Sequence, residues 1–244
     1  MEPLISNISV DCVIFGLHNR KLSVLLTKRE LTDPHSGHVL IADYTVQGHH
    51  VRVGENINDA AKRVLKDKTG LENIFLKQFY TFGETDRLLK EKDQLWKTMS
   101  FPEINNHVVS VGYYALVDSS KVKPVAGHSE TKWFPVKRLP ELGFDHDRII
   151  TMALDHLRSE IRREPVGYEL LPQKFTLTQL QNLYEAILDV KLDKRNFRKK
   201  VSNMAYVIAL NEKDNGPGKK PAQLFLFSWD VYEKTRKEKM DYLI

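Results

Sequence analysis

The residues with the clearest chemical potential form a basic segment late in the chain. Six of the ten residues from Lys191 to Lys200 are Lys or Arg, against a single acid, Asp193. Arginine can form bidentate hydrogen bonds with guanine, asparagine can do the same with adenine, and lysine can form an ion pair with phosphate. This segment therefore suits a nucleic acid. The candidate DNA contacts in it are Lys194, Arg195, Asn196, Arg198 and Lys199. A solvated helix face is the alternative, and charge alone does not decide between the two interpretations.

Two predicted helices position this basic segment. Thr176 and Gln179 have the spacing of a capping box at the start of the first helix. The apolar residues that follow are spaced for one buried face: Leu180, Leu183, Tyr184 and Ile187. Asp193 is a good N-cap for the second helix. Its apolar residues, which leave the basic ones facing outward, are Phe197, Val201 and Met204.

A predicted hairpin follows the two helices. The β-like runs Tyr206–Leu210 and Gln223–Phe227 flank Asn211–Ala222, a segment rich in Gly, Pro and Lys. Helix, turn, helix and hairpin together are the layout of a winged helix-turn-helix. Three further candidate DNA contacts lie at the first helix start and in the wing: Thr176, Lys219 and Lys220. A small helical appendage used for dimerisation is the alternative.

The first part of the chain has the pattern of a layered domain that mixes strands and helices. Val13–Phe15 and Leu22–Leu26, around a Gly/Asn turn, predict a hairpin. Further strands are predicted at Val39–Val46, Ile74–Phe82, His107–Val117 and Trp133-Phe134. Helices are predicted at Asn56–Thr69, capped by Asn56 and ended by Gly70, and at Asp147–Arg163. This order of elements predicts an α+β or α/β fold.

Composition and charge divide the chain in two. The 244 residues suit one large or two small domains. Residues 165–244 hold 14 Lys and Arg against 10 Asp and Glu, a net +4, which leaves 23 against 22, or +1, for residues 1–164. Pro165 and Pro172 bracket a connector. We therefore expect two domains with different functions, at residues 1–164 and at residues 165–244, and DNA binding in the second.

The same composition excludes several classes of protein. With 41% hydrophobic and 28% charged residues the chain is typical of a globular protein. No apolar run approaches the ~18 residues of a membrane span, and no basic segment precedes the first apolar residues as in a signal peptide. The single cysteine, Cys12, excludes an intrachain disulfide and fits a cytoplasmic location. No membrane partner is expected.

The segment from Gln47 to Leu71 resembles a Nudix box. The motif is Gly, five residues, Glu, seven residues, then Arg-Glu-apolar-any-Glu-Glu-any-Gly-apolar. The residues that match it are Glu55, Arg63, Leu65, Gly70 and Leu71. Where the motif has its first glycine, this chain has His49. Where the motif has its three helix glutamates, this chain has Val64, Asp67 and Lys68.

These departures bear on the chemistry that the resemblance implies. In the Nudix family the helix glutamates bind divalent cations against a pyrophosphate, and Mg²⁺ requires oxygen ligands. Val64 offers none, Lys68 would repel a dication, and Asp67 stands alone. We therefore expect no metal, no cofactor, no catalytic residues and no enzymatic activity. An active Nudix hydrolase with ligands from elsewhere is the alternative.

The chain from roughly residue 8 to 228 resembles the NrtR-type, Nudix-related transcriptional regulators. The most specific matches are Leu170-Leu171-Pro172, Phe175-Thr176-Leu177 and Asn196–Val201. The resemblance implies a Nudix-like α/β/α sandwich followed by a winged helix-turn-helix domain, an α+β arrangement overall. It further implies a homodimer that binds double-stranded operator DNA and is released or retuned by a small-molecule effector.

The sequence leaves the effector open. Some members of the family sense ADP-ribose, and others, including an arabinose-responsive branch, regulate sugar metabolism. The stretch His35–His50 is rich in hydrogen-bonding side chains that suit sugar hydroxyls. We expect a sugar such as L-arabinose, with ADP-ribose as the alternative. The candidate effector contacts are Lys28, Tyr44, Gln47, His50, Glu84, Arg87, His107, Asp145 and His146.

Structural roles for several of these residues remain open, since Tyr44 can belong to the core and Asp145 can cap the following helix.

A protein-interaction adaptor, with the basic segment facing an acidic partner, is a third functional hypothesis. The tail Trp229–Ile244 has the pattern of a charged helix that braces the wing, joins a dimer interface or frays.

Overall fold

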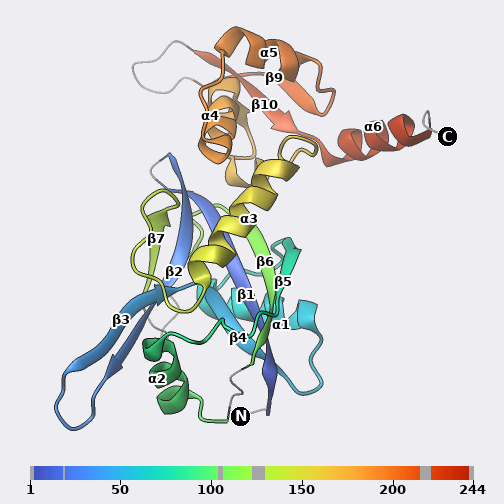
Figure 1. Ribbon diagram of the computed structural model, residues 1–244. Coiled ribbons are helices and arrows are strands. Elements are labelled where there is room, and N and C mark those ends of the chain that lie inside the picture. The colour runs from blue at the N-terminus through green and yellow to red at the C-terminus, as the bar shows by residue number, and fades with distance from the viewer. Residues whose placement is uncertain (1–2, 19, 104–106, 123–129, 215–220, 242–244) are drawn as a thin grey trace. The chain divides into compact units, whose positions relative to one another are not determined.

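The computed structural model describes residues 3–18, 20–103, 107–122, 130–214 and 221–241 (Figure 1). The chain divides into two compact units, Met1–Glu160 and Ile161–Ile244. The predicted boundary at residues 164 and 165 falls just inside the second unit. No helix of the described residues is long and apolar enough to cross a membrane.

The first unit is built on one mixed sheet. Its central path has the order β3 (Val39–Thr45), β2 (Lys21–Thr32), β1 (Leu4–His18), β6 (Val109–Val117) and β5 (Leu76–Phe82). Two more strands, β4 (Gln47–Arg52) and β7 (Thr131–Pro135), pair with β1 and β2. The predicted hairpin is present as the antiparallel β1–β2 pair, whereas β1 and β6 run parallel. The sheet places β1 at the centre of the domain.

Helices cover both faces of this sheet, as expected for a Nudix-like sandwich. Helix α1 (Ile57–Thr69) packs Ala60, Ala61 and Val64 on β1, β4 and β6, and α3 (His146–Glu160) crosses the sheet in Figure 1. The α1 caps are as predicted: the Asn56 side chain accepts from the Asp59 N–H at 2.9 Å, and Gly70 has φ of 69°. This left-handed conformation suits glycine because it has no Cβ.

A third helix of the first unit, α2 (Glu91–Ser100), is absent from our sequence predictions. Its N-cap, Lys90, makes no side-chain capping bond, and Asp93 is its only buried residue. A helix without a cap signal or an apolar stripe lacks both of the usual sequence signatures. As shown below, it supplies part of a pocket.

The second unit has the predicted winged-helix order. It begins with the short 3-10 helix η1 (Tyr168–Leu170), then β8 (Phe175–Thr176), α4 (Leu177–Leu188) and α5 (Lys194–Ser202). Strands β9 (Val207–Asp214) and β10 (Ala222–Phe227) complete a sheet of order β8-β10-β9. Both predicted caps are present, at Thr176 and Asp193. Helix α6 (Trp229–Asp241) follows.

Two details of this unit differ from the sequence predictions. Helix α5 ends at Ser202, so Met204 lies beyond it and is only partly buried. Strand β9 runs on to Asp214, so the wing is longer than the predicted strand Tyr206–Leu210.

Candidate functional site: a cationic pocket and a basic helix

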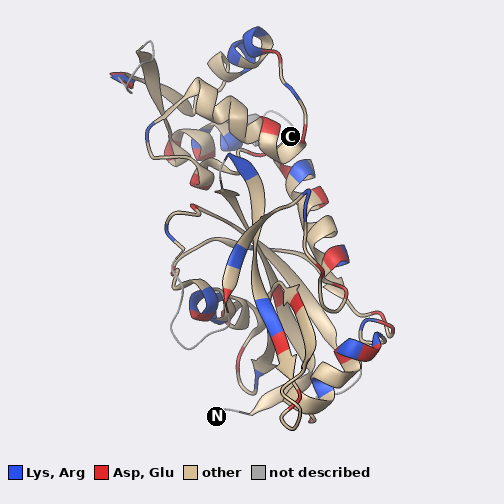
Figure 2. Cartoon of the chain, turned by 90° about the vertical axis from the view of Figure 1, so that its left-hand side faces the viewer, with Lys and Arg blue, Asp and Glu red and all other residues tan. Residues whose placement is uncertain are grey.

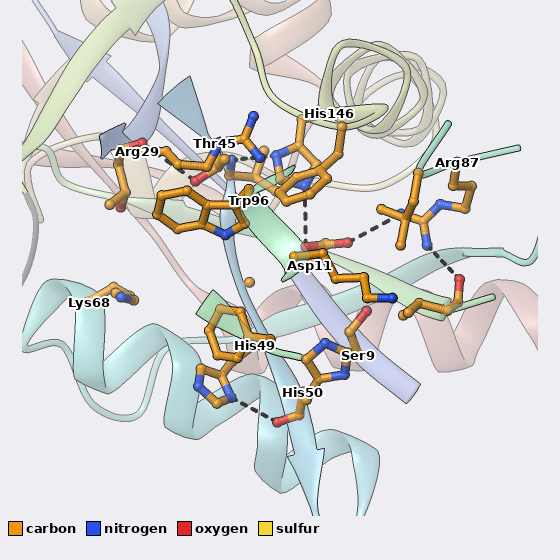
Figure 3. A pocket seen from close by; sticks show the side chains of 18 of the residues that line it. Ser9, Asp11, Arg29, Thr45, His49, His50, Lys68, Arg87, Trp96 and His146 are labelled. Atoms are coloured by element: carbon orange, nitrogen blue, oxygen red, sulfur yellow. Dashed lines mark hydrogen bonds and ion pairs between the residues drawn. The ribbon is translucent and has the colours of Figure 1, made fainter. Parts of the chain in front are cut away.

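A pocket of about 260 Å³ opens in the first unit, at the side of the sheet where β1, β2 and β4 meet α1 and α2 (Figure 3). Four of the nine predicted effector contacts line it: Lys28, His50, Arg87 and His146. The lining also includes aromatic and cationic residues that were not predicted: Arg29, Lys68, Trp96, Lys97, Phe101 and Phe144. Flat rings and cations together can bind an aromatic or anionic ligand.

Arg29 is the most constrained of these residues. Its guanidinium donates to both Asp43 oxygens at 2.7 Å and to Asp93 Oδ1 at 2.7 Å, and its side chain is only 3% exposed. Burial lowers its pKa, but the hydrogen bonds to Asp43 and Asp93 outweigh this and raise it. The guanidinium also lies 4.4 Å from the ring centroid of Phe144 and 5.2 Å from that of Trp96. Among the described residues, Arg29 Nη1 has no hydrogen-bond partner.

A buried polar cluster on β1 forms the other wall. Asp11 accepts from Ser110 Oγ, and its carboxylate lies 3.6 Å from Arg87 Nη2 and 3.7 Å from His146 Nε2. Arg87 also donates to both oxygens of Asp145, at 2.7 and 2.9 Å. Figure 3 shows Asp11 between Arg87 and His146. The cluster therefore links β1 to the start of α3.

His146 is held in its neutral form. Its Nδ1 accepts from the Val46 N–H at 3.1 Å, which requires an unprotonated Nδ1. Burial lowers its pKa, although the nearby carboxylates of Asp11 and Asp145 act in the opposite direction. Burial also lowers the pKa of His50, with a further contribution from His49. Both imidazoles are therefore neutral hydrogen-bonding groups at neutral pH.

Two predicted effector contacts, the half-buried Tyr44 and the buried Gln47, are not among the residues that line the pocket. The ring of Tyr44 packs edge-on against Phe134, with centroids 4.7 Å apart. Gln47 is fully buried: its side chain accepts from Thr27 Oγ1 at 2.6 Å and donates to the Leu25 carbonyl at 3.1 Å. The Gln47 amide is therefore engaged by β2 and lies outside the pocket lining.

Three more predicted contacts lie outside the lining formed by the described residues. Glu84 pairs with Arg148, and a ring nitrogen of His107 lies 3.1 Å from the Gly83 carbonyl oxygen. Asp145 does not line the pocket, but its ion pair orients Arg87, which does. Asp145 is thus a positioning residue.

The residues at the Nudix-box positions do not fit a divalent cation. Arg63 donates to both oxygens of Glu55, at 2.7 and 2.8 Å, and this interaction lowers the pKa of that carboxyl. Val64 is in the core with 1% exposure, and Lys68 lines the pocket. The described residues contain no cluster of three or more His, Cys, Asp or Glu side chains able to hold a metal.

The candidate DNA-binding surface lies on α5. Phe197 and Val201 are buried, whereas the five predicted contacts are exposed: Lys194, Arg195, Asn196, Arg198 and Lys199. Asp193 accepts from the Asn196 N–H at 2.8 Å and fixes the start of the helix. Figure 2 shows the basic residues of this short helix gathered on it. Because bases and phosphates both need exposed donors, this face can bind DNA.

The remaining predicted DNA contacts have different outcomes. Thr176 is 7% exposed, and its hydroxyl accepts from the Gln179 N–H at 3.2 Å within a complete capping box. It therefore caps α4 instead of presenting its hydroxyl to a ligand. Lys219 and Lys220 lie outside the described residues.

Comparison with known proteins agrees with this architecture. Residues 6–153 match the NUDIX domain model, and residues 167–227 match the model of the NrtR DNA-binding winged helix domain. The chain is 27% identical to the ADPR responsive transcriptional repressor NtrR of Acinetobacter baylyi, over 96% of this chain and 87% of that protein.

Two further similarities bear on the domains. A crystal structure of Shewanella oneidensis NrtR in complex with a 27mer DNA aligns with a TM-score of 0.72 at 25% identity, over 93% of this chain and 95% of that one. An ADP-ribose pyrophosphatase of Methanocaldococcus jannaschii is 25% identical over 55% of this chain and 68% of that enzyme. Since both domain models match in order and the likeness spans nearly the whole chain, the protein belongs to the NrtR-type family, in which a Nudix domain is joined to a winged helix domain.

Proposed function

We propose that this protein is a transcriptional repressor that binds operator DNA through α5 and responds to ADP-ribose bound in the pocket of its first unit. The observation that carries this proposal is the basic, outward face of α5 in a chain that also contains a ligand-sized pocket. The similarity of nearly the whole chain to an ADPR-responsive repressor supports it.

The choice of ADP-ribose replaces our expectation of a sugar such as L-arabinose. None of the relatives described above is named for a sugar response, and two of them are named for ADP-ribose. The pocket chemistry supports the same choice. Trp96, Phe101 and Phe144 suit a purine ring, and the cations around them suit a diphosphate.

Within the pocket we assign effector contacts to Lys28, His50, Arg87 and His146, as predicted, and add Arg29 and Trp96. The free Nη1 of Arg29 is a buried donor, and an unsatisfied buried donor costs about 1–3 kcal/mol until a partner is present. A phosphate or ribose oxygen would be that partner. We retain the predicted boundary between the effector-binding and DNA-binding functions at Pro165 as part of this proposal.

A homodimer is part of the proposal. One α5 reads only a short stretch of the major groove, and a dimer would read two half-sites about one helical turn, ~34 Å, apart or a multiple of it. Size-exclusion chromatography with light scattering would measure the mass, and a monomer on DNA would contradict this part.

Hydrolysis of ADP-ribose is the second candidate function, because a related enzyme is an ADP-ribose pyrophosphatase. The Glu55–Arg63 pair and the position of Lys68 weigh against it. Incubation of ADP-ribose with the protein and Mg²⁺ or Mn²⁺ would distinguish the two. Turnover that disappears in Glu55→Gln would favour the enzyme, whereas intact ADP-ribose favours the sensor.

The central experiment selects a binding sequence from random double-stranded oligonucleotides with the purified full chain. The selected duplex is then titrated in the presence of ADP-ribose or L-arabinose. We expect sequence-preferring binding that ADP-ribose weakens and L-arabinose leaves unchanged. Absence of any sequence preference at moderate salt would overturn the DNA-binding function, and a response to the sugar alone would overturn the effector.

A further inference from the structure

We propose that the pocket binds a diphosphate without a divalent cation, and that the ammonium group of Lys68 takes the place of the metal. This inference rests on the proposed function, because it concerns how the ADP-ribose pocket holds its ligand. The class of ligand is a nucleoside diphosphate or another organic diphosphate.

The position of Lys68 is the first support. It lies in the last turn of α1, at a position where the Nudix motif has a metal-binding glutamate, and it lines the same pocket as Arg29, Trp96 and His49 (Figure 3). Its side chain makes no hydrogen bond or ion pair among the described residues. The cation is thus available to a ligand.

The electrostatic state of Lys68 is the second support. The residue is partly buried, and this burial lowers its pKa, an effect that the neighbouring Asp67 only partly offsets. A partly buried ammonium without a partner is less stable than the same group in water. A phosphate oxygen within reach would reverse this penalty, since charge-assisted hydrogen bonds are stronger than neutral ones.

The charges around Lys68 are the third support. The lining contains five cationic side chains: Lys28, Arg29, Lys68, Arg87 and Lys97. The one carboxylate among the lining residues within the described ranges is Asp11, which is 6% exposed and already faces Ser110, Arg87 and His146. Neither Glu55 nor Asp67 is part of the lining. Lys28, Arg29 and Arg87 are already ion-paired with carboxylates. Lys68 has no such partner among the described residues, so its charge would repel a dication and attract a dianion.

Calorimetry on the full chain tests this inference. We expect ADP-ribose to bind with the same affinity in EDTA and in excess MgCl2. Lys68→Met should weaken binding by about tenfold or more in both buffers, since it removes a charge-assisted hydrogen bond to the ligand. Lys66→Met is the matched control: Lys66 lies in the same helical turn but is exposed and paired with Glu72, so it should leave binding unchanged. Binding that needs Mg²⁺ would overturn the inference.

A charge reversal adds a second readout. Lys68→Glu restores the carboxylate of the family motif, so binding should fall in EDTA and recover in part with Mg²⁺. Inorganic pyrophosphate, used as a thermal-shift probe, separates this inference from the proposed effector. Stabilisation of the wild type by pyrophosphate in EDTA, lost in Lys68→Met, supports the site even if ADP-ribose does not bind. No stabilisation by either compound without metal would overturn it.

Discussion

Arg195 in the first turn of α5 is exposed, and it is a cation at the helix end that favours anions. A guanine or phosphate would relieve this unfavourable placement. If Arg195 reads a base, Arg195→Ala should weaken binding to the selected operator by ~1–3 kcal/mol and relax preference at one position. Fluorescence anisotropy with operator and scrambled duplexes measures both effects.

The control for this prediction is Arg236→Ala, which removes an exposed arginine from α6 and should leave operator affinity unchanged. An equal loss on operator and scrambled DNA in Arg195→Ala would contradict base recognition and indicate a phosphate contact.

His146 makes a prediction about pH. Its pKa is lowered in the folded state by burial, whereas in the unfolded chain it is about 6.5. The unfolded state therefore binds more protons than the folded state as the pH falls below 6.5, and the free energy of unfolding should decrease. The groups facing His146 are Asp11 from β1, Arg29 from β2, and Arg87 and Asp145 from the loops beside it. Chemical denaturation between pH 7.5 and 5.5 is the measurement.

His146→Asn isolates this contribution, since an asparagine oxygen can accept from the Val46 N–H without binding a proton. The stability advantage of the wild type over this variant should be greatest above pH 6.5 and shrink on acidification. A constant difference for His146→Asn would contradict the assignment. His50, whose pKa is also lowered, contributes equally to both curves.

The next scale is the element, where the capping box of α4 makes a separable prediction. Thr176→Ala removes the hydroxyl that accepts from Gln179, and should lower the free energy of unfolding by about 1 kcal/mol. Thr176→Ser keeps that oxygen and should retain both stability and DNA affinity. If Thr176→Ser folds normally but loses operator binding, the side chain contacts DNA and the capping role is insufficient to describe it. Urea denaturation and anisotropy provide the two measurements.

Elements with their own end signals could be predicted from the sequence. Asn56 and Gly70 marked α1, and Thr176 and Asp193 marked α4 and α5, because each cap is a contact between residues close together in the chain. Helix α2 has no such signal. Its role depends on Arg29 and Asp93, which are far apart in the sequence and meet only in the fold.

Only some of the pocket residues could be predicted, because the pocket also depends on contacts between residues far apart in the sequence. The sequence identifies polar side chains but not the direction in which each one points. Alternation along a strand does not supply that direction here, because the neighbours Lys28 and Arg29 on β2 both line the pocket, as do His49 and His50 on β4. His50 on β4 lines the pocket, whereas Gln47 on the same strand hydrogen-bonds within the core. Arg29 escaped prediction because its neutralising partners, Asp43 on β3 and Asp93 on α2, are distant in the sequence.

At the scale of the whole molecule, chain order suggests how the pocket and the basic helix are connected. Helix α3 begins at His146, in the pocket wall, and ends at Glu160, the last residue of the first unit. A ligand that contacts Arg87 and His146 therefore acts on the start of the helix that precedes the DNA-binding unit. Such a ligand changes DNA affinity only if it binds the DNA-bound conformation and the free conformation of the protein with different affinities, and only by that difference.

This coupling must be reciprocal. If saturating ADP-ribose raises the dissociation constant of the operator by some factor, saturating operator must raise that of ADP-ribose by the same factor, typically 5–150-fold for allosteric proteins. Anisotropy measures the first and calorimetry the second, in one buffer and on one protein preparation. Inosine diphosphate ribose, which differs from ADP-ribose only in the base, is a useful comparison. The factor by which it weakens operator binding can differ from that of ADP-ribose, but the operator must weaken its binding by that same factor. Unequal factors for ADP-ribose would mean that it competes with DNA at a second location or that the oligomeric state changes on binding.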